Sequence, residues 1–370
     1  MTTITFCADV HLANHKRFGG PLVAGINRRC QLALDVLSAT AGQAKAAKAD
    51  ALVVLGDLFD GVRPEPQVIR ATQQALEQGP MPYLIVGNHD QVSASPGDHA
   101  LGPLAPCAVV VDEPHVYTVG STHLVCVPYR VGKVEDWLPG ALDQLAIPSE
   151  GVIVLAAHFG LRDEHTARHF QALPEAVDVR WLADLCKDRG ITHVFAGHWH
   201  CTEMWDISGV HIRQLGALVP SGFDDGGCAG MGQVVYLSDE GFKVRGDYMP
   251  GPRFLTVGAD RAEWAALTLT LGDMDKMRGC QVFLRVRAAH GDLADAIAWL
   301  GQLREAGRIY DGGVVDDAVE ARQAARLAAA GARSQVTMQE SLAAYVAEMP
   351  LDEGVSREDV LARATTYLGL

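Results

Sequence analysis

The hydrophobic residues of the chain gather in short runs that end abruptly in polar clusters. Such a run predicts a buried β-strand that delivers side chains at its carboxyl end, as in an α/β sheet. Five runs of this kind occur, at Ile4–Ala8, Ala51–Leu55, Tyr83–Val86, Val152–Ala157 and Val194–Ala196. Similar apolar stretches predict further strands at 122–127, 211–215 and 233–237.

In the segments between the first three of these strands, apolar residues recur at helical spacing. One predicted helix covers about residues 23–47, where Ile26, Cys30 and Leu34 fall on one face. A second covers about residues 65–78, with prolines at its start and Gly79 at its end. Strands and helices therefore alternate, which predicts an α/β fold. The strands are numerous enough for a two-sheet β-sandwich flanked by helices.

A cluster of breaker residues at Met249–Phe254 marks the best domain boundary. Beyond it, a strand at 281–287, a helix at 293–304 and a strand at 308–315 predict a small α/β unit. Two helical stretches follow, at about 317–347 and 356–368. These patterns predict three domains, at residues 1–255, 256–320 and 321–370.

The composition excludes several classes of protein. With 370 residues, of which 48% are hydrophobic and 21% charged, the chain can bury a core in more than one domain. The net charge of −14 argues against a polycation that holds nucleic acid by charge alone, although it does not exclude a nuclease. The eight cysteines form no Cys-x-x-Cys pair, which counts against a disulfide framework or a cysteine zinc site. No apolar stretch is as long as a membrane span, so we expect a cytoplasmic protein, of a bacterial cell or of a phage in its host.

Metal-ligand side chains follow each of the five strand-like runs. Two divalent ions held roughly 3.5–4 Å apart need about seven oxygen and imidazole ligands, one of which bridges both ions. The chain supplies such a set in order: Asp9, His11, Asp57, Asn88, His158, His198 and His200. Asp9 and His11 stand two residues apart, and alternate residues of a strand share a face, so both can point at one ion. Asp57, which follows the second strand-like run, is the natural candidate for the ligand that bridges both ions.

Each of these residues alone has an ordinary structural explanation. An aspartate after a glycine is usually a turn residue, a buried histidine is usually hydrogen-bonded, and Gly-Asn-His-Asp can form a simple turn. Five consecutive strand-like runs that all end in metal-ligand chemistry are improbable by chance. The sequence therefore predicts a centre for two divalent metal ions.

The motifs that carry these residues resemble the signature of the calcineurin-like metallophosphoesterases. They are Asp9-Val10-His11, Gly56-Asp57-Leu58-Phe59-Asp60, Gly87-Asn88-His89-Asp90, His158 and Gly197-His198-Trp199-His200. The resemblance implies the two-sheet sandwich of that superfamily. It also implies one metal ion on Asp9, His11, Asp57 and His200, and a second on Asp57, Asn88, His158 and His198.

The resemblance also implies how the reaction proceeds. A hydroxide shared by the two ions would attack phosphorus, and His89, oriented by Asp90, would be the catalytic imidazole that assists the leaving group. Manganese is the expected metal, with magnesium, iron or zinc as alternatives. Asp60 departs from the pattern, because some relatives have a histidine there; an acid at this position can still accept a hydrogen bond.

Finer features resemble the SbcD-type double-strand-break nucleases of that superfamily. Gly56–Pro66 runs from a Gly-Asp-Leu-Phe core into a Pro-x-Pro helix start, and Gln214–Phe223 is similar to a Gly-Ser-Leu element of these nucleases. The small α/β unit resembles the domain that caps their DNA groove. The resemblance implies a DNA exonuclease and endonuclease of repair and recombination, acting as a homodimer. It also implies a partner, an SbcC-like ABC-type coiled-coil ATPase, docked on the C-terminal helices.

Basic residues in loops after the site-forming strands are candidate contacts to the DNA backbone. They are Lys16, Arg17, Arg63, Arg130, Lys133 and Arg162. Two alternative functions stay open at this point. A small-molecule phosphodiesterase or phosphatase on the same metal core is disfavoured by the C-terminal extension, and a non-catalytic scaffold is disfavoured by the presence of His89 and Asp90.

Overall fold

The computed structural model divides the chain into two compact units. The larger unit comprises Met1–Arg287 and Ala294–Val314, and the smaller comprises Ala288–Leu293 and Val315–Leu370. The structure describes residues 2–163, 176–223, 231–238, 243–250, 252–258, 264, 267, 282–319, 356, 357, 360 and 363. The helical region predicted at 321–370 lies outside the described residues, apart from four single positions.

The first of two large sheets contains the first three predicted strands. Its order is β16 (Lys243–Pro250), β15 (Met231–Ser238), β1 (Thr3–Cys7), β4 (Ala51–Leu55), β5 (Pro82–Ile85) and β6 (Val109–Val111). Strands β1, β4, β5 and β6 are parallel, whereas β15 and β16 join antiparallel. The carboxyl ends of β1, β4 and β5 therefore meet at one edge of this sheet.

The second large sheet contains the other two site-forming strands. Its order is β13 (Glu203–Ile207), β14 (Val210–Gln214), β12 (His193–Gly197), β9 (Val152–His158), β8 (Thr122–Val127) and β7 (His115–Val119). The central four strands are parallel, and the outer two pair antiparallel. Here too the carboxyl ends of the central strands lie at one edge.

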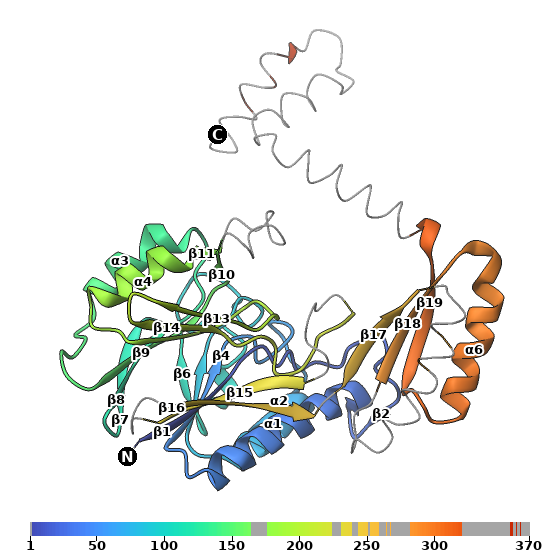
Figure 1. Cartoon of the computed structure of the whole chain (residues 1–370), viewed down its shortest axis with the longest axis horizontal. Helices are drawn as coiled ribbons and strands as arrows, with labels where there is room; N and C mark the ends of the chain where they lie inside the picture. Colours follow the sequence, from blue (N-terminus) through green and yellow to red (C-terminus); the bar gives the residue numbers. More distant parts are fainter. Residues whose placement is uncertain are drawn as a thin grey trace. The chain divides into compact units, whose positions relative to one another are not determined.

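Four helices cover the outer faces of the two sheets, so that the fold has four layers (Figure 1). Helices α1 (Arg28–Ala46) and α2 (Pro66–Leu76) pack on the first sheet, and α3 (Val134–Asp143) and α4 (Val179–Lys187) pack on the second. The mixed α/β sandwich predicted from the sequence is thereby confirmed. A short 3-10 helix, η1 (Gly102–Leu104), and the two-residue strands β10 (Leu161–Arg162) and β11 (Val177–Asp178) lie in the connections.

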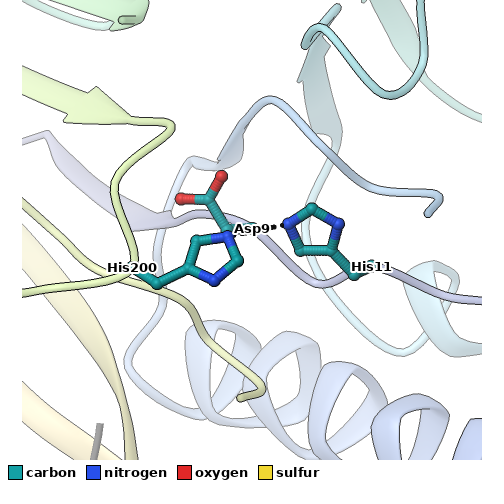
Figure 2. Close-up of side chains that lie close together, drawn as sticks. All are labelled: Asp9, His11 and His200. Carbon is teal, nitrogen blue, oxygen red and sulfur yellow. Dashed lines mark hydrogen bonds between the residues drawn. The ribbon is translucent and has the colours of Figure 1, made fainter. Parts of the chain in front are cut away.

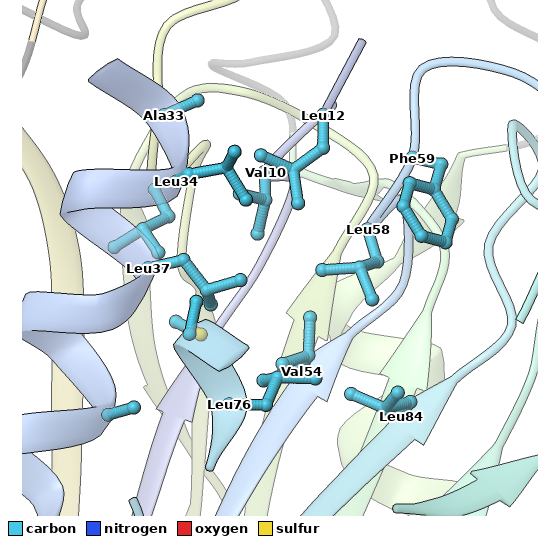
Figure 3. Close-up of a cluster of buried hydrophobic side chains, with 14 of the residues drawn as sticks. Val10, Leu12, Ala33, Leu34, Leu37, Val54, Leu58, Phe59, Leu76 and Leu84 are labelled. Carbon is cyan, nitrogen blue, oxygen red and sulfur yellow. The ribbon is translucent and has the colours of Figure 1, made fainter. Parts of the chain in front are cut away.

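The strands of both sheets are buried on both faces, which explains why they appear as continuous apolar runs. In β4, Leu52 and Val54 face α1 and α2, and Figure 3 shows Val54 in the same apolar cluster as Leu37 of α1 and Leu76 of α2. The alternate residues of β4 face the second sheet. Between the sheets, the rings of Phe6 and Phe195 stack with their centroids 4.4 Å apart. Packing on both faces fixes the register of these strands and hence the positions at which their site-bearing ends emerge.

Helix α1 begins five residues later than the sequence predicts. Leu22–Val23 (β2) and Ile26–Asn27 (β3) form a short antiparallel hairpin instead of the first helical turn. The Asn27 side chain then caps the helix by accepting a hydrogen bond from the backbone N–H of Cys30 at 2.9 Å.

A smaller sheet follows the sandwich in the chain. It consists of β17 (Arg253–Val257), β18 (Val282–Ala288) and β19 (Asp311–Asp316), with α6 (Leu293–Glu305) between the last two and the 3-10 turn η3 (His290–Asp292) before it. Strand β17 was not predicted, and the boundary predicted after residue 255 falls within it. The division into three domains stays a prediction.

Candidate metal centre

The seven predicted ligands emerge at the carboxyl ends of five parallel strands from both sheets. Asp9 and His11 follow β1, Asp57 follows β4, and Asn88 follows β5. His158 is the last residue of β9, while His198 and His200 follow β12. The two sheets meet here, because the ring Nδ1 of His158 donates a hydrogen bond to the carbonyl of Leu55 in β4 at 2.7 Å.

Four of the seven residues have a left-handed backbone, which non-glycine residues adopt only when the surrounding structure enforces it. Their φ angles are 52° for Asp9, 50° for His11, 50° for Asp57 and 92° for His198. Backbone hydrogen bonds hold this conformation, since the N–H of His11 donates to the carbonyl of Asp57 at 3.0 Å. Such strain costs on the order of 1–3 kcal/mol per residue, and it clusters at functional sites.

This geometry corrects the reason given above for the convergence of Asp9 and His11. Strand β1 ends at Cys7, so the two residues lie beyond it and do not share a face of a strand. Their left-handed turns direct both side chains to the same point, as Figure 2 shows.

Two glycines of the motifs permit the close approach of these loops. A Cβ atom on Gly56, which has a φ of 84°, would overlap the ring of His158. A Cβ atom on Gly87 would overlap both the carboxylate and the backbone nitrogen of Asp57. Any larger residue at either position would push a predicted ligand out of place.

The first group of converging donors comprises Asp9, His11 and His200 (Figure 2). The Nε2 atoms of His11 and His200 lie 3.0 Å apart, and all three donor atoms lie within 4.8 Å of one another. The Asp9 carboxylate is completely buried and is held in place by the backbone N–H of His198 at 3.0 Å.

The second group comprises Asp57, His158 and His198, to which Asn88 adds an amide oxygen. Asn88 Oδ1 lies 2.9 Å from His158 Nε2 and 2.9 Å from His198 Nδ1. Asp57 Oδ2 lies 3.4 Å from His158 Nε2. The donor atoms of these four side chains therefore lie close enough together to bind one ion.

Asp57 links the two groups. Its Oδ2 atom is 3.8 Å from His11 Nε2, and Asp57, His11 and His89 form a further set of donors within 4.8 Å. A carboxylate that faces both groups is the arrangement that a bridging ligand requires.

The chemistry of the donors fits divalent metal ions. Imidazole nitrogens, carboxylate oxygens and an amide oxygen are the ligands of Mn²⁺, Fe²⁺ and Zn²⁺ in proteins. Two imidazole Nε2 atoms only 3.0 Å apart would repel each other if both presented lone pairs, and a cation between the donors relieves that repulsion. The His158 Nδ1–H bonded to Leu55 leaves Nε2 facing the site, as is usual for a metal-ligating histidine.

The pKa values of the donors differ, so a bound metal ion would displace protons from some of them and not from others. Burial, together with the charge of His158, lowers the pKa of His198 to about 3, so this ring is neutral at pH 7 and offers a lone pair. Burial acts to raise the pKa of Asp57, but the charge and hydrogen bond of His158 outweigh it and hold the pKa well below its ordinary value. Burial acts to lower the pKa of His158, and the charge of Asp57 overcomes it and raises the pKa to about 9. The pKa of Asp9 is raised, chiefly by burial.

The predicted catalytic residue His89 stands at the open side of the site. Its side chain is 43% exposed, whereas His11 and His158 are buried, so a substrate can reach it. Its backbone N–H donates to Asp57 Oδ1 at 2.9 Å, and its ring lies edge-on to that of His11 with the centroids 4.8 Å apart. The ring is thus both accessible and positioned next to the donors.

The expected pairing of Asp90 with the His89 ring differs from what the structure shows. The Asp90 carboxylate is fully buried and accepts backbone hydrogen bonds from Leu58, Phe59 and Gly87 at 3.3, 2.9 and 3.1 Å. Burial, with the charge of Asp57, raises the pKa of Asp90 to about 7. Asp90 therefore ties together the two loops that carry Asp57 and Asn88.

Asp60 lies where Asp90 was expected. Its backbone carbonyl is 3.3 Å from Nδ1 of His89, and its carboxylate is 3.9 Å from the same atom. The carboxylate also lies 3.3 Å from His11 Nδ1 and 3.5 Å from His15 Nδ1. Asp60 therefore faces three histidine rings at the rim of the site.

Sequence reasoning missed Tyr129, which covers the second group. Its ring stacks against His198 with the centroids 6.1 Å apart and lies edge-on to His158 at 6.3 Å. Tyr129 lies two residues after the end of β8 and before Arg130, so the signal used for the other strands, a polar cluster at the end of an apolar run, was present here too.

The basic residues predicted to contact DNA are all exposed. Lys16 and Arg17 lie in the loop after β1, Arg63 lies before α2, and Arg130 and Lys133 lie before α3. Arg162 ends β10. Their contact with DNA stays a prediction.

A comparison with family models identifies the family of the chain. Residues 2–202, more than half of the chain, match the family model of the calcineurin-like phosphoesterases. A comparison with curated proteins returned no match.

Several solved structures are similar to the chain at low identity. The protein TT1561 of Thermus thermophilus is 12% identical over 67% of this chain and 98% of its own, with a TM-score of 0.44. A dimetal phosphatase from Danio rerio is 12% identical over 67% of this chain and 96% of its own, with a TM-score of 0.37. An archaeal phosphodiesterase is 10% identical over 67% of this chain and all of its own, with a TM-score of 0.36.

None of the helices in the described part of the chain combines the length and the apolar character that crossing a bilayer demands.

The match to the family model spans all five strands that carry the predicted ligands. The chain therefore belongs to the calcineurin-like phosphoesterases, a family of hydrolases that act on phosphoester bonds through dimetal centres.

Proposed function

We propose that the protein is a DNA phosphodiesterase of the SbcD-like type that processes DNA ends. In this proposal, seven side chains hold two divalent ions, with manganese as the working metal. The protein would act in the cytoplasm as a homodimer together with a coiled-coil ATPase. The site of the family fixes phosphoester hydrolysis, and the choice of DNA as substrate rests on features around that site.

The residues of the site would have separate roles in hydrolysis. Asp9, His11 and His200 would hold one ion, and Asn88, His158 and His198 the other, with Asp57 between them. When bound, the ions supply positive charge that neutralises phosphate oxygens and lowers the pKa of water at the site. His89 stands at the exposed side, where its ring can give a proton to the departing oxygen of the substrate. Asp60 lies against the Nδ1 side of that ring and orients it.

The observation that carries the choice of DNA is the small α/β sheet packed beside the metal centre. Phe283 of β18 and Phe254 of β17 stack with their centroids 4.8 Å apart. Phe18, in the loop that follows His11, lies 6.1 Å from Phe283 and 5.5 Å from Phe223. Phe223 in turn follows Ser221, whose Oγ is 3.5 Å from Nδ1 of His200. An added sheet joined to the loop after His11, and to the segment whose Ser221 lies beside His200, suits a polymer substrate that extends beyond the metal centre.

Arginines strengthen this junction. The Arg29 guanidinium lies 5.0 Å from the ring of Phe254, and Arg285 lies 5.0 Å from that of Phe223. Both arginines are 8% exposed, and Arg29 also donates to the backbone carbonyls of Arg17 and Ser221. Partly desolvated cation–π contacts of this kind contribute roughly 1–2 kcal/mol each. The added sheet is thus held to the loops on which Lys16 and Arg17 present their charges.

A direct test separates DNA from small esters. The full chain is incubated with Mn²⁺ and, in separate reactions, with linear duplex DNA, single-stranded DNA, bis-p-nitrophenyl phosphate and a cyclic nucleotide. We expect DNA to be cut, and His89→Ala to lose that cutting. His115→Ala, which changes an exposed histidine of β7 away from the site, is the matched control.

Each other outcome assigns a different function. Turnover of the small esters with DNA untouched would make the protein a small-molecule phosphodiesterase. Absence of turnover on all four substrates, in a folded sample saturated with metal, would indicate a non-catalytic scaffold.

A further inference from the structure

A cavity of about 300 Å³ lies beside the loop that carries Asn88 and His89. The cavity is lined by Gln91 and Pro96 of that loop, by Asp112 and Glu113 after β6, by residues after β8, and by Trp137 of α3. The volume is at the lower end of the range for small-molecule sites. It suits a single flat ring system with its sugar and is too small for the stacked bases of a duplex.

One wall of this cavity continues to the metal ligands. Tyr129, Arg130 and Trp137 line the cavity and also line a smaller hollow together with His158 and His198. The ring of Tyr129 stacks against His198, as described above. A molecule in the cavity is therefore separated from the second group of ligands by little more than the Tyr129 ring.

The shared wall has the chemistry of a stacking platform. The guanidinium carbon of Arg130 lies 5.7 Å from the centre of the Trp137 ring, and Tyr129 adds a second aromatic face. Aromatic rings interleaved with arginine bind unpaired bases in many proteins that hold single-stranded nucleic acid.

Two acidic residues also line the cavity. Asp112 and Glu113 place two carboxylates there, and Asp112 is held by the backbone N–H of Gly97 at 2.8 Å and by His99 at 3.5 Å. Two carboxylates repel a phosphate but accept hydrogen bonds from amino groups. The cavity therefore selects an uncharged ring that bears an exocyclic amino group and leaves the phosphate to the metal centre.

We infer that this cavity, lined by Gln91, Tyr129, Arg130 and Trp137, receives the unpaired base of a nucleotide whose phosphate lies at the metal centre. The inference rests on the proposed function and deepens it, because it makes DNA with frayed or single-stranded ends the preferred substrate. A base can enter only after it leaves the duplex, so the cavity favours ends over continuous duplex.

Binding of nucleotides tests the inference without relying on DNA cleavage. Isothermal titration calorimetry compares dAMP, dTMP and 2-deoxyribose 5-phosphate on the manganese-saturated full chain. All three carry the same phosphate, so differences between them report on the base. We expect dAMP to bind about 5- to 150-fold more tightly than the sugar phosphate, the range for stacking of one base, with dTMP between them. Equal affinities for dAMP and the sugar phosphate would overturn the inference.

Substitutions locate the effect in the cavity. We expect Trp137→Ala to bring dAMP close to the sugar phosphate and Trp137→Phe to keep most of the preference. Arg130→Ala changes an exposed residue whose loss the fold tolerates, and it should also weaken the preference for dAMP. Trp181→Ala on α4 is the matched control, since this tryptophan does not line the cavity. Melting temperatures show whether each variant is folded, and a full preference in both Trp137→Ala and Arg130→Ala would overturn the inference.

A second arm distinguishes DNA from free nucleotides as the source of the base. It compares cleavage of an oligonucleotide with an unpaired terminal adenosine against the same oligonucleotide with an abasic terminal residue. Faster cleavage of the first supports the inference for DNA. Cleavage of both at one rate refutes it and leaves the nuclease intact. If dAMP binds through its base but no DNA is cut, the cavity is a nucleotide-binding site. The proposal that the protein is a nuclease is then refuted.

Discussion

Replacement of Gly87 by alanine tests whether the spacing of the loops, and not only the identity of the ligands, makes the metal centre. The new Cβ would overlap the carboxylate and backbone nitrogen of Asp57 and would lie 2.9 Å from its Cγ. Rotation of a side chain cannot relieve the overlap with a backbone atom. The φ of Gly87 is not in the left-handed region, so alanine is conformationally allowed and the effect is steric alone.

The magnitude follows from how far Asp57 must move. Relief of the overlap requires a shift of about 1 Å, and a displacement of that size in a catalytic constellation costs on the order of 10²-fold in rate. Overpacking destabilises a fold by about 1–3 kcal/mol, which a protein of ordinary stability survives. We therefore expect a folded Gly87→Ala variant with weakened metal binding and strongly reduced turnover.

The assay combines three measurements on one sample: Mn²⁺ affinity by calorimetry, kcat/KM on bis-p-nitrophenyl phosphate, and the melting temperature. Gly61→Ala is the matched control, because it lies in the loop of Asp57 and a Cβ there meets no atom within 4 Å. If Gly87→Ala binds Mn²⁺ and turns over the ester as well as Gly61→Ala does, the argument from loop spacing is refuted.

Three further predictions concern single residues. His89→Ala should lower kcat by roughly 10²- to 10⁴-fold while the metal content measured by mass spectrometry stays unchanged; loss of metal would instead identify His89 as a ligand, as its proximity to His11 and Asp57 allows. Asp90→Ala should cost on the order of 3 kcal/mol or more in urea unfolding, because three buried backbone N–H groups lose their acceptor; a loss below about 1 kcal/mol would contradict this role. Burial, with the charge of His211, lowers the pKa of His193 from 6.5 to about 4, so the unfolded chain takes up a proton more readily. Stability should therefore be complete above about pH 6.5 and fall by up to about 3 kcal/mol as the pH drops to 4, and His193→Gln should lack this component; equal pH profiles would refute it.

The sequence was sufficient to predict the strands that carry the site. Runs such as Val152–Ala157 are apolar on both faces and end in a ligand, and both properties follow from a parallel strand buried between two layers. Edge strands were harder to predict. In β13, Met204 is 59% exposed and Asp206 is exposed, so this strand lacks a continuous apolar pattern. Strand β17 was taken for a breaker segment because prolines precede it.

The arrangement of the site was only partly predictable. Spacing in sequence identified Asp9, His11 and His198, but their left-handed backbone depends on hydrogen bonds to loops that are distant in the chain. The different roles of Asp60 and Asp90 have the same origin. Both acids follow a motif residue closely, and only the packing of the two loops determines which one faces solvent and which one is buried.

The central claim is that seven side chains from five strands hold a pair of divalent ions around Asp57. The most direct measurement is the manganese content of the folded, saturated chain, by calorimetric titration and elemental analysis, compared with that of Asp57→Ala. The account predicts two ions for each chain, and loss of both when Asp57 is replaced, since this carboxylate faces both groups of donors. A single ion at saturation, or two ions retained without Asp57, would contradict it.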